Sequence, residues 1–358
     1  MRKIQVETSR SYDVLMNSGL LKDAGKLIQE IGRGEKICLV SDINVYEIFG
    51  ETLVNSLEHS GFEVYKILFP PGEETKSIFC LERILEYMAE NEFSGTDLLV
   101  GLGGGVIGDL TGFAAATFLR GIDFVQIPTT LLAAVDSSIG GKTAINLKSG
   151  KNLAGAFYQP SLVLFDSDTL ITLPNDRYKD GMSEIIKSAM IADKDFFEFI
   201  AAENIRSRQF ITECITKAIN IKSKIVKADE KDRGIRKLLN FGHTMAHAIE
   251  SCSGYKISHG HAVAIGMTAC ARASEKLEWI KRPSSQRLSQ VLEDYGINPS
   301  CPFQAHELTK AALRDKKRHG KTISLIIPLQ IGECAIKEIP IENLEEFFRI
   351  GLEKYTDI

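Results

Sequence analysis

The chain has 358 residues, of which 44% are hydrophobic and 25% charged, which is the composition of a folded globular protein and excludes a disordered or fibrous one. Its formal net charge of -4 gives no overall positive field, so nucleic acid is not an expected partner. Seven scattered cysteines without a C-x-x-C pair argue against a disulfide framework or a thiolate zinc site.

The beginning of the chain lacks the apolar segment of a secretory signal. Later apolar stretches are broken by Gly, Asp or Pro well short of the roughly eighteen residues that a membrane helix needs. We therefore expect a cytoplasmic protein with no membrane partner.

Short β-branched or leucine-rich segments alternate with helical segments in the first half of the chain. The strand-like segments are residues 36–40, 63–69, 97–101, 124–128 and 162–166. Between two of them, residues 78–90 place apolar side chains at helical spacing on one face. This alternation predicts a Rossmann-like α/β domain, with a parallel sheet flanked by helices.

The pattern changes near residue 176, beyond which the apolar spacing is mainly helical. Residues 322–339 are an exception and predict a hairpin that turns at Gly332. We therefore expect an α/β domain over residues 1–175 and a mainly α-helical domain over residues 176–358. Ligands of open α/β sheets bind at the carboxyl ends of the strands, so the site is expected in the cleft between these domains.

A strand at residues 97–101 runs into a glycine-rich turn and then into a helix. Gly103, Gly105 and Gly108 satisfy G-x-G-x-x-G, which lets the backbone approach a pyrophosphate at a helix N-terminus. The acidic residue that usually ends the following strand has no counterpart here, so the turn indicates a variant of the Rossmann arrangement, with tight packing as the alternative. Asp42 is a candidate for a ribose hydroxyl, and a surface turn explains it equally well.

Four of the seven histidines lie close together, at positions 243, 247, 259 and 261. Two helical histidines with a carboxylate from elsewhere are typical of a catalytic zinc site with an open position. Glu184 is the best carboxylate candidate, although Glu184 and Lys187 also have the spacing of a surface ion pair. Spacing alone does not decide which histidines bind metal, and a zincin-like arrangement would use His243 and His247.

Eight long motifs follow one another along nearly the whole chain. They are SDINV (41–45), PPGEETKS (70–77), GGGVIGDLTGFAAATFLRGI (103–122), IPTTLLAAVDSSIGGKTAIN (127–146), GKNLAGAFYQP (150–160), SEIIKSAMI (183–191), DEKDRGIRKLLNFGHTMAHAIE (229–250) and HGHAVAIGM (259–267). In this order they resemble the 3-dehydroquinate synthase family of the sugar phosphate cyclases. The resemblance implies a dehydroquinate synthase-like fold, an NAD-binding N-terminal domain, a helical metal-binding C-terminal domain and a homodimer.

The resemblance also implies a set of site residues. The metal ligands would be Glu184, His243 and His259, holding Zn²⁺ or, as a substitute, Co²⁺. The NAD contacts would be Asp42, Asn44, Glu73, Lys76, Gly104, Gly105, Val106, Asp109, Thr129 and Thr130, together with Lys142 and Lys151. The substrate pocket would contain Asp136, Lys142, Lys151, Asn152, Lys187, Lys222, Arg236, Asn240, His247 and either Lys316 or Lys317. Arg120 would reach the pocket of the neighbouring subunit.

One departure from the family pattern lies beside a ligand. The family usually has H-G-E where this chain has His259-Gly260-His261, so His261 must replace the usual Glu in a different way, or compete for the metal.

The implied reaction converts 3-deoxy-D-arabino-heptulosonate 7-phosphate into 3-dehydroquinate and phosphate, a step of the shikimate pathway to aromatic amino acids, with NAD regenerated in each turnover. The cationic residues fit a substrate that carries a carboxylate and a phosphate. Three alternatives stay open: a sibling cyclase of the 2-deoxy-scyllo-inosose or valiolone type, a metal-dependent polyol dehydrogenase, and a regulatory protein that retains the fold.

Overall fold

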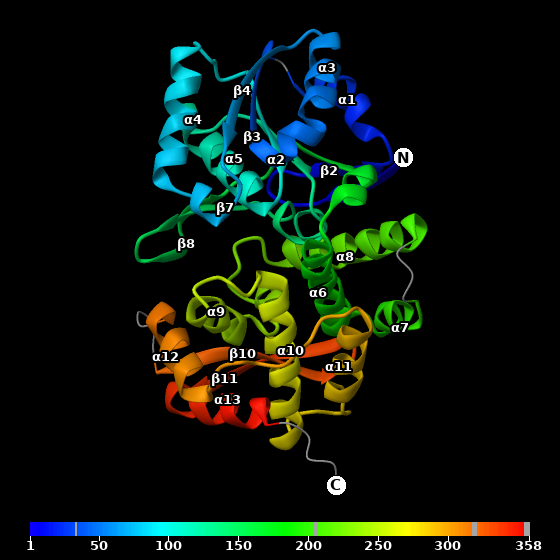
Figure 1. Cartoon of the computed structure of the whole chain (residues 1–358), viewed down its shortest axis with the longest axis vertical. Coiled ribbons are helices and arrows are strands. Elements are labelled where there is room, and N and C mark those ends of the chain that lie inside the picture. Colours follow the sequence, from blue (N-terminus) through cyan, green and yellow to red (C-terminus); the bar gives the residue numbers. More distant parts are fainter. Residues whose placement is uncertain (33, 204–206, 317–320, 354–358) are drawn as a thin grey trace. The chain divides into compact units, whose positions relative to one another are not determined.

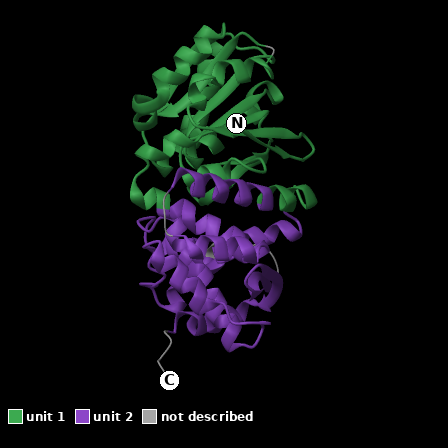
Figure 2. Cartoon of the chain, turned by 90° about the vertical axis from the view of Figure 1, so that its right-hand side faces the viewer, with its two compact units in different colours: residues 1–178, 222–231 green, residues 179–221, 232–358 purple. Residues whose placement is uncertain are grey.

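The computed structural model describes residues 1–32, 34–203, 207–316 and 321–353. Contacts divide the chain into two compact units, one of residues 1–178 and 222–231 and the other of residues 179–221 and 232–358 (Figure 2). The helices α6 (Asn175–Ala192) and α8 (Arg208–Ala228) each contribute residues to both units. Among the described residues, no helix is both long and apolar enough to cross a membrane.

The first unit is built on a seven-stranded sheet in the order β1-β2-β9-β6-β5-β3-β4 (Figure 1). Only β1 and β2 pair antiparallel. The strands are β1 (Arg2–Val6), β2 (Tyr12–Asn17), β3 (Lys36–Asp42), β4 (Glu63–Phe69), β5 (Leu98–Gly103), β6 (Phe124–Pro128) and β9 (Leu162–Asp166). The five strands predicted from sequence are confirmed as β3, β4, β5, β6 and β9. The sequence patterns do not predict β1, β2 or the antiparallel hairpin of β7 (Lys142–Leu147) and β8 (Gly150–Phe157).

Helices cover both faces of this sheet. They are α1 (Ala24–Gln29), α2 (Ile43–Val45), α3 (Glu51–His59), α4 (Ile78–Glu90) and α5 (Gly105–Thr117). Side chains alternate between the faces along each strand: Ile37 and Leu39 of β3 join the cluster under α1 and α3, whereas Cys38 and Val40 join the cluster under α4 and α5. Because β5, β6 and β9 are buried on both faces, their sequences are almost continuously apolar.

The second unit is mainly helical, as the sequence predicts. Its further helices are α7 (Lys194–Ala202), α9 (His243–Cys252), α10 (His259–Lys276), α11 (Ser285–Asp294), α12 (Ala305–Lys316) and α13 (Leu344–Leu352). α10 is buried along most of its length and packs against α9, α11 and α13 (Figure 1). The predicted hairpin is confirmed as β10 (Thr322–Gln330) and β11 (Glu333–Pro340), and Gly332 takes a φ of 84° at its turn.

The strand order of the first unit reverses between β3 and β5. The chain leaves β3 toward β4 on one side, and leaves β5 toward β6 on the other. Asp42 ends β3, Gly103 ends β5, and the register pairs Ser41 with Leu102. Because β3 and β5 are parallel neighbours, Asp42 and the glycine turn both lie at the carboxyl end of the sheet. Open α/β sheets bind their ligands at this end, where the strand order reverses.

Candidate active site

Three potential ligands converge in the second unit. Glu184 lies on α6, while His243 and His259 are the first residues of α9 and α10. Glu184 Oε1 lies 3.8 Å from His243 Nε2 and 3.6 Å from His259 Nε2. One ligand atom from each residue lies within 4.8 Å of the other two, and this is the only such group found among the described residues.

The carboxylate of this group is deeply buried beside a cation. The side chains of Glu184 and Lys187 are each 2% exposed, and Lys187 Nζ pairs with Glu184 Oε2. This pair is therefore not the surface ion pair that its i,i+3 spacing also suggests. The pairing leaves the other oxygen, Oε1, as the atom that faces both imidazoles.

The two imidazoles have opposite charge preferences. Burial, reinforced by the Lys187 cation, holds the pKa of His243 well below its usual value, so its ring is neutral. Burial also acts to lower the pKa of His259, but hydrogen bonds to the carboxylates of Glu184 and Glu250 outweigh it and raise this pKa to about 10. A metal ion would therefore displace a proton from His259 as it binds.

Close packing of α6 and α10 fixes the start of α10. Asp180 Oδ1 accepts hydrogen bonds from Ser258 Oγ at 2.5 Å and from the backbone N–H of His261 at 3.3 Å. Gly260 faces the backbone of Asp180, where an added Cβ would lie 2.3 Å from the Cα atom of Asp180. Asp180 is four residues before Glu184, so one helix face supplies both the carboxylate of the group and the anchor for the helix that carries His259.

The other two histidines of the cluster lie outside the ligand group. The exposed His247 packs edge-on against the ring of His243, with the ring centroids 5.6 Å apart. His261 Nε2 lies 2.7 Å from the backbone carbonyl of Asn298. His261 is therefore occupied by a loop carbonyl, and the structure does not bring it into the group with Glu184.

The remaining predicted residues of the second unit lie before His243 and on α12. Arg236 and Asn240 lie in a short 3₁₀ helix, Ile235–Asn240, in which Arg236 is buried and Asn240 is exposed. Lys316 ends α12, and Lys317 lies outside the described residues.

A polar cluster around the buried Lys76 joins predicted residues of the first unit. Lys76 Nζ pairs with Asp109 on α5 and donates a hydrogen bond to Asn152 Oδ1 at 2.5 Å. Asn146 donates to Glu73 Oε1 at 2.7 Å, and Lys151 Nζ lies 3.8 Å from the same oxygen. Residues from three segments that are far apart in the sequence, at positions 73 and 76, 109, and 152, thus come together on the side of α5 next to the β7–β8 hairpin.

A second pair in this unit anchors α8. Lys222 Nζ donates hydrogen bonds to Asp136 Oδ1 at 2.6 Å and to the Asp136 carbonyl at 2.5 Å. Lys142, at the start of β7, is exposed. Arg120 is also exposed, directly after α5, in a left-handed conformation with a φ of 70°.

The glycine turn positions a helix N-terminus. Gly104 is the N-cap of α5, and the Thr129 N–H donates to the Gly103 carbonyl at 2.9 Å. This bond places Thr129 and Thr130 beside the residues at 104–106. Asp42 caps α2 by accepting from the Val45 N–H at 3.0 Å, and burial raises the pKa of its carboxyl. Asn44 lies in the same short helix.

Two charged residues near Glu184, His243 and His259 are not predicted by the sequence patterns. Glu250, 5% exposed, lies on α9 seven residues after His243, and Asp180 lies four residues before Glu184. Residues four or seven positions apart lie on the same face of a helix, so each of these carboxylates shares a face with a candidate ligand. This spacing is the sequence pattern that could have predicted them.

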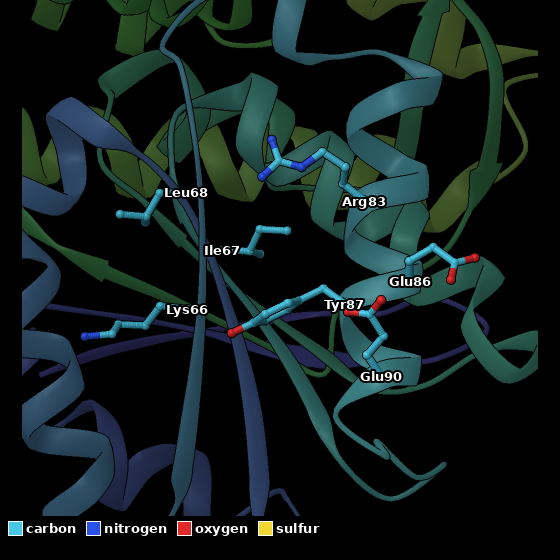
Figure 3. A pocket seen from close by; sticks show the side chains of 7 residues that line it. All are labelled: Lys66, Ile67, Leu68, Arg83, Glu86, Tyr87 and Glu90. Atoms are coloured by element: carbon cyan, nitrogen blue, oxygen red, sulfur yellow. The ribbon is translucent and has the colours of Figure 1, made fainter.

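A hollow in the first unit lies apart from all these residues. It is lined by residues 66–68 of the edge strand β4 and by Arg83, Glu86, Tyr87 and Glu90 of α4 (Figure 3). None of the predicted site residues lines it, so its shape adds nothing to the candidate site.

Family models match most of the chain. The model of the 3-dehydroquinate synthase N-terminal domain matches residues 66–180, and that of the C-terminal domain matches residues 181–318. A 3-dehydroquinate synthase of Microcystis aeruginosa is 41% identical over 337 residues, which is 92% of each chain. The chain belongs to the 3-dehydroquinate synthase family.

Solved structures give the same fold at lower identity. A 2-deoxy-scyllo-inosose synthase, solved with carbaglucose-6-phosphate, NAD⁺ and Co²⁺, has a TM-score of 0.89 at 23% identity and covers 97% of this chain and 99% of its own. A 2-epi-5-epi-valiolone synthase of Streptomyces hygroscopicus, solved with NAD⁺ and Zn²⁺, has a TM-score of 0.85 at 23% identity, covering 96% and 97%. The 3-dehydroquinate synthase family therefore shares its dehydroquinate synthase-like fold with these sugar phosphate cyclases.

The Lys76–Asp109 pair gives a stability prediction. Lys76→Met should lower the free energy of unfolding by about 3–5 kcal/mol at about pH 8, because it leaves a buried carboxylate without its cation. Burial raises the pKa of Asp109 and Lys76 opposes this rise, so the variant's carboxyl has a still higher folded-state pKa. Such a group retains its proton in the folded state at a pH where the unfolded chain has lost it, so stability falls as the pH rises.

Urea unfolding of the wild type and Lys76→Met at about pH 5 and about pH 8 measures this effect. The loss of stability should be larger at the higher pH. Lys76→Met/Asp109→Asn is the matched control, whose difference from the wild type should not depend on this titration. An equal loss at both pH values in the single variant would show that Asp109 is not the affected group.

Proposed function

We propose that this chain converts 3-deoxy-D-arabino-heptulosonate 7-phosphate into 3-dehydroquinate and inorganic phosphate, with NAD and a divalent metal ion as cofactors. The observation that carries the proposal is the convergence of Glu184, His243 and His259 in a chain that belongs to this family. When bound, the two cofactors supply a transient oxidation of one substrate hydroxyl, whose pKa the ion lowers, and the return of the same hydride. Phosphate elimination and aldol ring closure occur on the substrate itself.

The donor set fits a zinc ion. Two imidazoles and one carboxylate leave an open position, which is the pattern of catalytic zinc sites. Tetrahedral ligands at about 2.0–2.1 Å from a zinc ion lie roughly 3.3 Å from one another, and the 3.6 and 3.8 Å distances to Glu184 Oε1 come close to this spacing. We therefore assign the ion to Glu184, His243 and His259, with Zn²⁺ as the resident metal and Co²⁺ as a substitute.

The residues at the β3–β5 edge fit a dinucleotide. The N-cap of α5 is glycine, so no side chain competes with a pyrophosphate for the N–H groups of the first turn. Asp42 lies on the adjacent strand and would accept a hydrogen bond from a ribose hydroxyl. The proposed NAD contacts are Asp42, Asn44, Glu73, Lys76, Gly104, Gly105, Val106, Asp109, Thr129, Thr130, Lys142 and Lys151.

The substrate is proposed to be a carboxylated sugar phosphate. Buried Lys187 and Arg236 can balance anionic groups that have left water, because a cation in a desolvated position interacts more strongly with an anion. The proposed substrate contacts are Asp136, Lys142, Lys151, Asn152, Lys187, Lys222, Arg236, Asn240 and His247, with Lys316 or Lys317. His247 is exposed beside His243 and lies outside the converging group of Glu184, His243 and His259, so we assign it a role in moving a proton.

The activity test uses purified protein with zinc, a catalytic amount of NAD⁺ and the heptulosonate phosphate. We expect inorganic phosphate release that matches the 3-dehydroquinate formed, and no accumulation of NADH, because the hydride returns in each turnover. Glu184→Gln is the matched control: it keeps the volume of the side chain beside Lys187 but removes the charge that holds the ion, so phosphate release should fall to background.

Other outcomes identify the alternatives. NADH accumulation without phosphate release would replace the proposal with a polyol dehydrogenase. Turnover only of a sugar phosphate without a carboxylate would replace it with a sibling cyclase. Full activity of Glu184→Gln would remove the role proposed for the metal group.

We further propose a homodimer in which Arg120 reaches the neighbour's substrate. Its support is the exposure of Arg120 and its position after α5, together with the family resemblance. Arg120→Ala and Glu184→Gln should each be inactive alone. Mixed dimers of the two should regain about a quarter of wild-type activity, because half of the dimers would then contain one complete site. No recovery would show that Arg120 acts within its own subunit, and full activity of Arg120→Ala alone would show that the site does not need it.

The cysteines fit a reducing compartment. All seven are thiols rather than disulfide partners, and Cys38, Cys214 and Cys270 are buried. We propose a cytoplasmic location, which cell fractionation would test.

A further inference from the structure

Glu250 occupies the side of His259 that faces away from Glu184. Its carboxylate Oε2 lies 3.2 Å from His259 Nδ1, while His259 Nε2 lies 3.6 Å from Glu184 Oε1. The two nitrogens of one imidazole thus face two different carboxylates. Glu250 is 5% exposed, so its carboxylate is largely shielded from water, whereas the side chain of His259 is 31% exposed.

The proposed reaction gives Glu250 no role. It is not part of the group whose ligand atoms converge, and Nδ1 is on the opposite side of the imidazole from the atoms of that group. A buried carboxylate is costly to maintain unless a partner compensates for its lost hydration. The His259 ring is a partner that meets this requirement.

We infer that Glu250 is a positioning residue for the metal site: it accepts a hydrogen bond from His259 Nδ1–H and thereby directs the Nε2 lone pair toward the ion. This inference rests on the metal site proposed above. Fixing the proton on Nδ1 selects the tautomer that can coordinate through Nε2, and the carboxylate makes the ring a stronger donor to a metal.

The other ligand histidine is supported in a weaker way. His243 Nδ1 lies 3.2 Å from the backbone carbonyl of Phe241, a neutral acceptor. A carboxylate polarises an imidazole more than a neutral carbonyl does. The two imidazoles therefore differ in basicity, and the loss of Glu250 should affect the contribution of His259 alone.

Separate contacts hold the backbone and the ring of His259. The start of α10 is fixed through Asp180, which accepts from Ser258 Oγ and from the His261 N–H. Glu250 Oε2 contacts the imidazole of His259 rather than the backbone at the start of α10. A substitution at Glu250 can therefore release the ring while the helix stays in place, which makes the inference testable by metal affinity.

The test measures Zn²⁺ affinity of metal-stripped protein by competition with a chromophoric chelator, for the wild type, Glu250→Ala and Glu250→Gln. Removing the acceptor in Glu250→Ala should weaken zinc binding about 10–100-fold. Glu250→Gln keeps an oxygen acceptor but loses the charge, so its affinity should lie between the two. The visible absorption bands of the Co²⁺-loaded protein should shift in the same order, because they report the ligand field directly.

Glu275→Gln is the matched control. Glu275 is a carboxylate of the same unit that accepts hydrogen bonds from the N–H groups of Ser284 and Ser285 at the start of α11. None of these bonds involves Glu184, His243 or His259. It should lower the free energy of unfolding without changing zinc affinity or the Co²⁺ bands. A purely structural role for Glu250 would give the same result in Glu250→Gln.

The positioning role would be overturned if Glu250→Gln bound zinc as tightly as the wild type and showed unchanged Co²⁺ bands. The same holds for Glu250→Ala if that variant folds. This failure differs from failure of the metal site itself. If the wild type bound no stoichiometric zinc, or if Glu184→Gln bound it as tightly as the wild type, the ligand assignment would be refuted, whatever Glu250 does.

Discussion

The second unit depends on one buried carboxylate that must satisfy a cation and two imidazoles at once. Glu184 and Lys187 are both almost fully buried, and such a pair stabilises a fold only when further polar partners compensate for the lost hydration. His243 Nε2 and His259 Nε2 face the other carboxylate oxygen at 3.8 and 3.6 Å. The start of α9, the start of α10 and the middle of α6 are therefore constrained to meet, and Asp180 and Glu250 hold the same three helices in register.

Much of the fold follows from local pattern. β5, β6 and β9 are buried on both faces, so their sequences are short apolar runs that predict parallel strands. The β7–β8 hairpin could not be predicted this way. β8 contains Gly150, Lys151, Asn152 and Gly155, which are residue types that strands usually avoid, and it forms because β7 pairs with it along its length.

The site was only partly predictable because its members come from distant segments. Helical spacing could indicate that His243 and His247 share a face, but it could not show that the turn after α9 brings His259 to Glu184 in place of His247. Spacing also could not distinguish a surface Glu–Lys pair from the buried pair at 184 and 187. The family resemblance implies His259 and Glu184 as metal ligands, whereas the pairing of Lys76 with Asp109 depends on tertiary contacts that no local pattern contains.

We propose that Glu184, His243 and His259 together hold one divalent ion. The most direct measurement is X-ray diffraction from crystals of the zinc-loaded protein, recorded on both sides of the zinc absorption edge. We expect one anomalous peak at about 2.0–2.1 Å from a Glu184 oxygen and from Nε2 of His243 and His259. A peak bound through His247 or His261 instead, or no peak between these three side chains, would contradict it.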